Sequence, residues 1–320
     1  VLILAHVKEL LEQNADKIRK LCPELKIGIY SAGLRSRDTT EQVIVAGIQS
    51  VYNKACELDA FDLVIVDEAH LISSEGDGMY RTFLSDMKVI NPHVRVIGLT
   101  ATPFRLKGGL ICKPENILNE ICYEAGLKEM IQQGYLSPLI SRAGRAEANL
   151  ANLHIRGGEF ISDEVAAAMD NDALVTSACR EIVELTGDTS PAERAEIIAR
   201  FKGEFIPADL FGTPKPPLKF LANVNVLTCG FDAPNTDCVV MLRPTNSPGL
   251  LIQCAGRGTR LSPETGKSNC LFLDYGGNIL RHGPLDMIKV KEPGSGKGGD
   301  APAKKCPQCL ALIHAGYTAC

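Results

Sequence analysis

Tryptophan is absent from this sequence, and aromatic residues make up only 5% of it. Proteins that hold nucleic acid mainly by stacking bases on aromatic side chains need more of them, so that mode of binding is excluded. No apolar run approaches the roughly 20 residues of a membrane-spanning helix, and no signal peptide is visible. The sequence therefore predicts a soluble, cytoplasmic protein.

The sequence also lacks a surplus of positive charge and a disulfide pattern. Its net charge of −4 at pH 7 excludes a uniformly basic wrapper of nucleic acid but leaves room for a local basic groove. Of the 12 cysteines, only Cys306, Cys309 and Cys320 cluster, and the others are scattered singly, as in proteins with reduced thiols. The chain opens on a predicted strand at Val1 without an initiator methionine, and we expect this to be a cut end.

The most informative segment is a short apolar run that ends in two carboxylates. Residues Leu63–Val66 are apolar and mostly β-branched, which predicts a buried parallel strand. Asp67 and Glu68 follow at once, at the end of the strand where open α/β sheets bind ligands. One carboxylate there can hold a hard cation through water, and the other can take a proton from an attacking water. The alternative is that the pair only caps the next helix.

Two arginines form a second candidate site. The segment Gly249–Thr259 predicts a helix, which would place Arg257 and Arg260 on one face with Gln253 one turn earlier. Paired guanidinium groups suit a polyphosphate, because they are forked donors that stay charged. Upstream, Thr228–Pro234 predicts a strand-to-turn element whose glycine and aspartate expose backbone and carboxylate.

Strands alternate with helical segments along most of the chain, which predicts a doubly wound parallel sheet. Helices are also expected in the middle of the chain, over Ile117–Gly134 and over Asp163–Leu185. The predicted strands are Val1–Ala5, Lys26–Tyr30, Val43–Ala46, Phe61–Val66, Arg95–Leu99, Lys219–Leu227, Cys238–Leu242 and Cys270–Asp274.

Four motifs occur together, in an order and at intervals that make a strong joint signal. They are Asp67-Glu68-Ala69-His70, Thr100-Ala101-Thr102, Thr228-Cys229-Gly230-Phe231-Asp232 and Gln253-Cys254-Ala255-Gly256-Arg257-Gly258-Thr259-Arg260. In these motifs the chain resembles superfamily 2 helicases of the DEAD/DEAH-box type, where they are motifs II, III, V and VI. Phrases such as Gly230-Phe231-Asp232-Ala233-Pro234 resemble most closely the bacterial RadD-like DNA-repair helicases.

The resemblance implies an α/β fold of two RecA-like parallel-sheet motor domains. The first would lack its N-terminal strand and phosphate-binding loop, and the second its motif IV unit. A truncated zinc-ribbon-like tail would follow them. The expected segments are 1–105 (first motor domain), 106–185 (connecting helical region), 186–288 (second motor domain), 289–305 (flexible linker) and 306–320 (start of the cysteine-rich tail).

The resemblance also implies ATP and Mg²⁺ as cofactors, and a role for each motif. Glu68, Arg257 and Arg260 would be catalytic, and Asp67 would hold Mg²⁺ through water. The remaining expected contacts are with the nucleotide (Asp67, His70, Gly230, Asp232 and Gln253), between the domains (Thr100 and Thr102) and with nucleic acid (His6, Lys8, Gly47, Gln49, Ser50 and Thr228).

One part of the family pattern is missing from the sequence. No Walker A loop is present, and Gly266-Lys267-Ser268 does not supply it, because Leu261 stands where that motif needs a glycine. We expect the loop upstream of Val1. The chain as written should therefore bind and hydrolyse ATP poorly.

The tail carries half of a zinc-ribbon pattern. Cys306 and Cys309 have the Cys-x-x-Cys spacing of a zinc knuckle, and Cys320 is a third candidate ligand. His314 is an alternative ligand, although a single histidine in such a turn is more often a surface residue. The sequence predicts Zn²⁺ in the longer protein.

The leading hypothesis is a truncated ATP-dependent DNA helicase or translocase that acts in DNA repair or recombination. Its partners would be single-stranded or forked DNA, with single-stranded-DNA-binding or recombination proteins beside it. One alternative is a non-catalytic nucleic-acid-binding remnant. Another is a restriction or remodelling translocase that does not separate strands.

Overall fold

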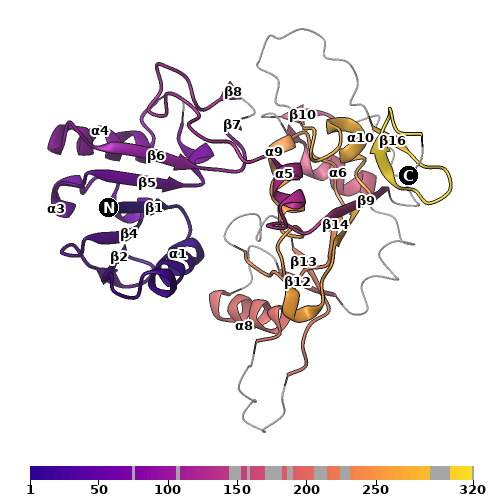
Figure 1. Cartoon of the computed structure of the whole chain (residues 1–320), viewed down its shortest axis with the longest axis horizontal. Coiled ribbons are helices and arrows are strands. Elements are labelled where there is room, and N and C mark those ends of the chain that lie inside the picture. The colour runs from indigo at the N-terminus through magenta and orange to yellow at the C-terminus, as the bar shows by residue number, and fades with distance from the viewer. Residues whose placement is uncertain are drawn as a thin grey trace. The chain divides into compact units, whose positions relative to one another are not determined.

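The structure is a computed structural model, shown in Figure 1. It describes residues 1–73, 76–105, 109–143, 153–156, 159–169, 182–185, 190–204, 215–223, 231–288 and 303–318. These residues form two compact units, the first up to Glu124 and the second from Ala125 onwards. The finer division into five segments stays a prediction. None of the helices in the described ranges is long and apolar enough to span a membrane.

The first unit is built on a six-stranded sheet in the order β3-β2-β4-β1-β5-β6 (Figure 1). Neighbouring strands are parallel, except that β3 runs antiparallel to β2. The parallel strands therefore all end at one edge of the sheet, the edge at which such sheets bind ligands. The strands are β1 (Leu2–Ala5), β2 (Ile27–Ser31), β3 (Ser36–Arg37), β4 (Val43–Gly47), β5 (Leu63–Asp67) and β6 (Arg95–Leu99), followed by the hairpin β7 (Phe104–Arg105) and β8 (Gly109–Leu110).

Helices cover this sheet on both faces. Successive residues of each strand point to opposite sides, so both faces of the sheet carry apolar side chains that need to be covered. On one face, Leu2 and Leu4 are buried with Phe83. On the other face, Ala5 is buried with Leu11. The parallel α/β fold predicted from the sequence is thus confirmed. The helices of this unit are α1 (Lys8–Leu21), α2 (Ile48–Val51), α3 (Ala55–Leu58), the short 3₁₀ helix η1 (Ala69–Leu71) and α4 (Met79–Ile90).

Gly98 in β6 marks a point of close packing next to the candidate site. A Cβ atom there would lie 2.6 Å from Leu118 Cδ1 and 2.7 Å from Ala69 Cβ. We expect Gly98→Ala to lower the free energy of unfolding of this unit by about 1–3 kcal/mol, the usual cost of overpacking. Urea denaturation would measure it. Gly33→Ala is the matched control, since the nearest atom to its added Cβ is Ser31 Oγ at 3.7 Å; equal midpoints for the two variants would contradict the prediction.

The second unit has a parallel three-stranded sheet in the order β14-β15-β9 and a separate parallel pair, β12-β13. The strands of this unit are β9 (Leu139–Ala143), β10 (Ile155–Arg156), β11 (Glu159–Phe160), β12 (Ile182–Leu185), β13 (Phe220–Asn223), β14 (Cys238–Met241), β15 (Cys270–Asp274), β16 (Ala303–Lys305) and β17 (Leu312–His314). Its helices are α5 (Leu127–Gln132), α6 (Ser162–Met169), α8 (Pro191–Lys202), α9 (Pro248–Gly256), the 3₁₀ helix η2 (Pro263–Thr265) and α10 (Asn278–His282).

Two helices predicted in the middle of the chain are wrong in part. Within Ile117–Gly134 only α5 is helical, because Gly126 before it is extended, with φ −69° and ψ 136°. Within Asp163–Leu185, α6 is helical but Ile182–Leu185 is a strand that pairs with β13. A short apolar run with β-branched residues fits either structure, and pairing with a neighbouring strand decides it. Residues 170–181 and 186–189 lie outside the described residues, so the missing motif IV unit stays a prediction.

Candidate active site

The acidic pair lies at the carboxyl end of β5. Asp67 is the last residue of the strand, and Glu68 follows with φ 52° and ψ 50°. This left-handed conformation costs a residue with a side chain about 1–3 kcal/mol and is concentrated at functional sites. The turn ends the strand at the sheet edge and starts η1.

Hydrogen bonds hold the Asp67 carboxylate in place. Asn14 Nδ2 of α1 donates to Asp67 Oδ2 at 3.0 Å, and the backbone N–H of Glu68 donates to Asp67 Oδ1 at 3.0 Å. A carboxylate offers about four acceptor positions, so each oxygen keeps capacity for a further donor. This arrangement fits a hydrated cation such as Mg²⁺, held through its water molecules.

Glu68 belongs to a connected series of polar side chains. His70 Nδ1 lies 3.2 Å from Glu68 Oε2 and 3.1 Å from Thr100 Oγ1. A proton on Nδ1 therefore faces both acceptors. The Thr100 hydroxyl in turn donates to the backbone carbonyl of the buried Thr102 at 3.3 Å and accepts from its N–H at 3.0 Å. The structure thus joins the end of β5 to the segment after β6.

A buried tyrosine lies close to the two carboxylates. Tyr80 in α4 is only 4% exposed, and its hydroxyl has no hydrogen-bond partner within the described part of the chain. Burial, and then the charges of Asp67 and Glu68, raise the pKa of Tyr80. The phenol therefore stays protonated, and its hydroxyl is a buried donor beside the acidic pair. No sequence motif pointed to this residue.

The residues expected to contact nucleic acid in the first unit lie at the same edge of the sheet. Gly47 ends β4 beside Ala5 of β1, and Gln49 Nε2 donates to the backbone carbonyl of His6 at 2.6 Å. Ser50 Oγ accepts from a backbone N–H in the loop after β2 at 3.0 Å. Lys8 is exposed at the first position of α1. Thr228 and Gly230 of the second unit lie outside the described residues.

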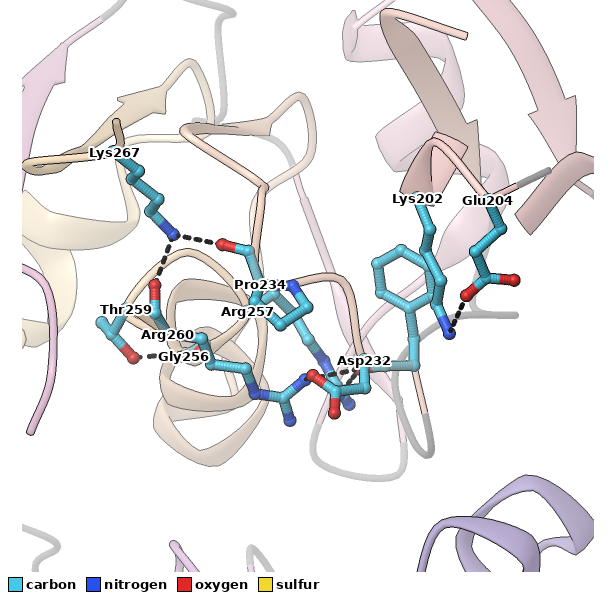
Figure 2. A network of polar contacts seen from close by, with 10 residues as sticks. Lys202, Glu204, Asp232, Pro234, Gly256, Arg257, Thr259, Arg260 and Lys267 are labelled. Carbon is cyan, nitrogen blue, oxygen red and sulfur yellow. Dashed lines mark hydrogen bonds and ion pairs between the residues drawn. The ribbon is translucent and has the colours of Figure 1, made fainter. Parts of the chain in front are cut away.

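The two predicted arginines converge on one loop, although they do not lie on one helix face. The predicted helix Gly249–Thr259 is wrong at its end, because α9 stops at Gly256 and Arg260 lies in the following turn. Nη1 atoms of Arg257 and Arg260 nevertheless donate to the same acceptor, the backbone carbonyl of Phe231; both arginines are labelled in Figure 2. Arg260 also forms an ion pair with Asp232. The half-buried Gln253 lies one turn before Arg257 on α9.

Close packing fixes the turn that carries these arginines. A Cβ on Gly258 would lie 2.2 Å from Cys270 Sγ at the start of β15, so only glycine fits. The backbone N–H of Ser137 donates to the carbonyl of Thr259 at 2.6 Å. The turn therefore rests on the three-stranded sheet, which sets where the two guanidinium groups lie.

A second polar cluster in this unit had no counterpart among the predicted motifs. The carboxylate of Asp274 accepts from Asn278 Nδ2 at 3.0 Å and from the N–H of Ile279 at 2.7 Å. Asn278 Oδ1 in turn accepts from the N–H of Thr245 at 2.7 Å. Burial raises the pKa of Asp274, and these hydrogen bonds oppose the rise. The cluster joins the end of β15 to the loop before α9. Its only signal in the sequence is an asparagine, Asn278, that follows the strand-ending Asp274 by four residues.

The cysteine-rich tail forms a hairpin next to β9, at the edge of the three-stranded sheet. Cys306 and Cys309 lie between β16 and β17, and the N–H of Ala143 in β9 donates to the carbonyl of Leu310 at 2.9 Å. His314 Nδ1 accepts from the N–H of Gly316 at 3.1 Å. The described residues contain no group of three side chains that could hold a metal ion, and Cys320 lies outside them.

Comparison with known proteins identifies the family. Residues 1–105 match the family described as "Type III restriction enzyme, res subunit", and residues 161–262 match "Helicase conserved C-terminal domain". The chain is 27% identical over 319 residues to a candidate ATP-dependent helicase, IRC3, of Saccharomyces cerevisiae, and 30% identical over 320 residues to a candidate mitochondrial ATP-dependent helicase, irc3, of Schizosaccharomyces pombe. The chain belongs to helicase superfamily 2.

This superfamily 2 chain spans about half the length of those relatives. The alignments cover 86% and 88% of the chain, but 43% of the first relative and 49% of the second. Among solved structures, it resembles a fragment of a candidate type I restriction-enzyme HsdR subunit from Vibrio vulnificus, with a TM-score of 0.54, 20% identity, and coverage of 90% of this chain and 55% of that one. It also resembles the type ISP enzyme LlaBIII bound to DNA, with a TM-score of 0.52, 18% identity, and coverage of 85% and 24%. These likenesses show the RecA-like helicase fold.

Proposed function

We propose that the chain is part of an ATP-driven motor that moves along nucleic acid, with DNA as its preferred substrate. The observation that carries the proposal is the polar series Glu68–His70–Thr100–Thr102, which begins at the sheet edge where His6 and Gln49 also lie. LlaBIII, a structural relative, is described as bound to DNA, which supports nucleic acid as the substrate. A role in DNA repair rests on the RadD-like resemblance.

In this proposal the carboxylates of the first unit serve ATP hydrolysis. Asp67 would hold Mg²⁺ through water, and Glu68 would take a proton from the water that attacks the γ-phosphate. Bound Mg²⁺ would neutralise charge that builds up on the phosphate oxygens. His70 orients the Glu68 carboxylate through its Nδ1 and passes changes at Glu68 to Thr100 and Thr102.

The resemblance to superfamily 2 helicases implies that residues of the second unit would act on the same nucleotide. Arg257 and Arg260 stabilise negative charge on the γ-phosphate in the transition state, as arginine fingers do in related phosphoryl-transfer enzymes. Gln253 and Asp232 contact the nucleotide from the neighbouring helix and loop. ATP binding and release then alternate the motor between two states.

The test is ATP hydrolysis with and without single-stranded DNA. It is measured on this chain and on the chain preceded by the phosphate-binding loop expected upstream. Hydrolysis by the longer chain that DNA stimulates would support the motor. DNA binding without any hydrolysis in the longer chain would overturn it and favour the non-catalytic remnant.

A translocase that does not separate strands is the second candidate function. The match of residues 1–105 to a restriction-enzyme family and the 25% identity to the type I restriction enzyme EcoAI subunit favour it. Displacement of a third strand from a DNA triplex, without release of a strand from a forked duplex, would select this function over a helicase.

Contacts to phosphates would make binding sequence-independent and sensitive to salt. We expect Lys8→Ala to reduce the slope of log affinity against log salt concentration by about 0.7, the loss of one phosphate contact with single-stranded DNA. Fluorescence anisotropy of a labelled oligonucleotide would measure it. Lys20→Ala, at the other end of α1, is the control. Equal slopes for Lys8→Ala and the unaltered chain would contradict the prediction.

We also propose that the cysteine-rich tail holds a zinc ion. Cys306 and Cys309 supply two thiols in one hairpin, which fits half of a structural zinc site, and Cys320 would add a third. Measurement of bound zinc in the purified protein, before and after a double Cys306→Ser and Cys309→Ser substitution, would test it. Equal zinc content in the two proteins would refute the site.

A further inference from the structure

Lys267 has a place in the structure that its sequence context did not indicate. It follows η2, and its Gly266-Lys267-Ser268 segment is too incomplete for a phosphate-binding loop. Its ammonium group instead donates to two backbone carbonyls, to Arg260 O at 2.7 Å and to Pro234 O at 2.9 Å. Figure 2 shows both bonds. The lysine is therefore committed to the protein's own backbone.

Those two carbonyls belong to the two segments that form the arginine site. Pro234 ends the loop that contacts the two arginines. In this loop the Phe231 carbonyl accepts hydrogen bonds from both of them, and the Asp232 carboxylate pairs with Arg260. Arg260 is itself one of those arginines. Lys267 thus joins the loop to the arginine turn through their backbones, while the guanidinium groups join them through side chains. Ser137 Oγ adds a weaker bond to Arg260 O at 3.3 Å.

We propose that Lys267 is a positioning residue for Arg260: by bridging the carbonyls of Arg260 and Pro234, it fixes the backbone from which the guanidinium reaches the phosphate. This rests on the proposed function, because it assigns Lys267 to the hydrolysis that Arg260 serves. A lysine suits the task, since its ammonium has three donors and a flexible stem that reaches carbonyls in two separate segments.

The groups around Lys267 affect the charge of its ammonium group, and the protein compensates that charge. Burial lowers the pKa of Lys267 first, Cys270 and Asp237 oppose that shift, and the nearby Arg260 adds to it. A cation placed beside an arginine and partly out of water needs compensation. The two carbonyl bonds supply it.

The experiment uses the full-length protein and compares Lys267→Met, Lys267→Arg and Lys219→Met. We expect Lys267→Met to lower kcat for DNA-stimulated ATP hydrolysis about tenfold, because small misplacements of a catalytic group have such costs. The KM for ATP and the melting temperature should stay close to those of the unaltered protein. Lys267→Arg should recover part of the rate. Lys219, exposed before β13, is the matched control and should change nothing.

Amide hydrogen exchange is a second measurement of the role of Lys267, and it does not depend on ATP hydrolysis. In Lys267→Met, amides of residues 231–236 and 257–262 should exchange faster, and those of β15 should not. A kcat within twofold of the unaltered protein, or unchanged exchange in both segments, would overturn the proposal. Faster exchange in a protein that hydrolyses no ATP at all would refute the proposed motor instead, while showing that Lys267 holds the arginine turn.

Discussion

Replacing Glu68 with glutamine is expected to lower DNA-stimulated ATP hydrolysis by about 10²–10⁴-fold, the usual contribution of a general base. Glutamine has nearly the same shape but cannot accept the proton of an attacking water. It keeps an oxygen that can accept from His70 Nδ1, which lies 3.2 Å from Glu68 Oε2. The series through Thr100 should therefore survive, so the lost rate would report the proton transfer rather than a collapsed site.

The measurement is steady-state hydrolysis by the longer chain, together with its affinity for ATP. We expect the affinity of Glu68→Gln to remain within a few fold, since Asp67 keeps its hydrogen bonds from Asn14 and from the backbone. Glu12→Gln, on the exposed side of α1, is the matched control for loss of one negative charge. Glu68→Gln with a rate equal to that control would refute the base assignment and return the pair to the role of a structural turn.

The strand that carries this site could be predicted because its signals are local. A short β-branched run followed by charged residues predicts a strand. Since Asp67 ends that strand, the sequence also predicts the edge of the sheet at which Asp67 lies. The left-handed turn at Glu68 and the contact between Glu68 and His70 could not be predicted from the sequence. Both depend on how η1 packs against Gly98. Tyr80 was missed for the same reason, since only the fold brings this residue of α4 close to the charges of the acidic pair.

The second unit shows where local signals fail. The motif with Arg257 and Arg260 indicated a helix, yet α9 ends at Gly256 and a turn packed on Cys270 takes over. The convergence of both arginines on the carbonyl of Phe231 joins residues 26 and 29 positions apart, so no periodic pattern encodes it. Lys267 was rejected as a phosphate ligand from its sequence, and its backbone contacts became visible only with the fold.

Replacing Arg260 should have an effect of similar size. An arginine finger is worth about 10³–10⁵ in rate in comparable phosphoryl-transfer enzymes, so Arg260→Ala should cost about 10³-fold in kcat. Arg260→Lys should recover little, because an ammonium cannot reproduce the forked geometry of a guanidinium. Arg156→Ala, on the exposed β10, is the matched control and should hydrolyse ATP normally.

The stability of Arg260→Ala separates a catalytic role from a structural one. Arg260 pairs with Asp232, but their side chains remain 36% and 21% exposed, so solvent screens the pair. Loss of a pair of this kind costs about 0–1 kcal/mol. A thousandfold loss of rate with a nearly unchanged unfolding midpoint would therefore identify Arg260 as acting on the phosphate. A large drop in the midpoint with a proportionate loss of active protein would show instead that Arg260 mainly holds the Phe231–Pro234 loop, and Arg257 would become the finger to test.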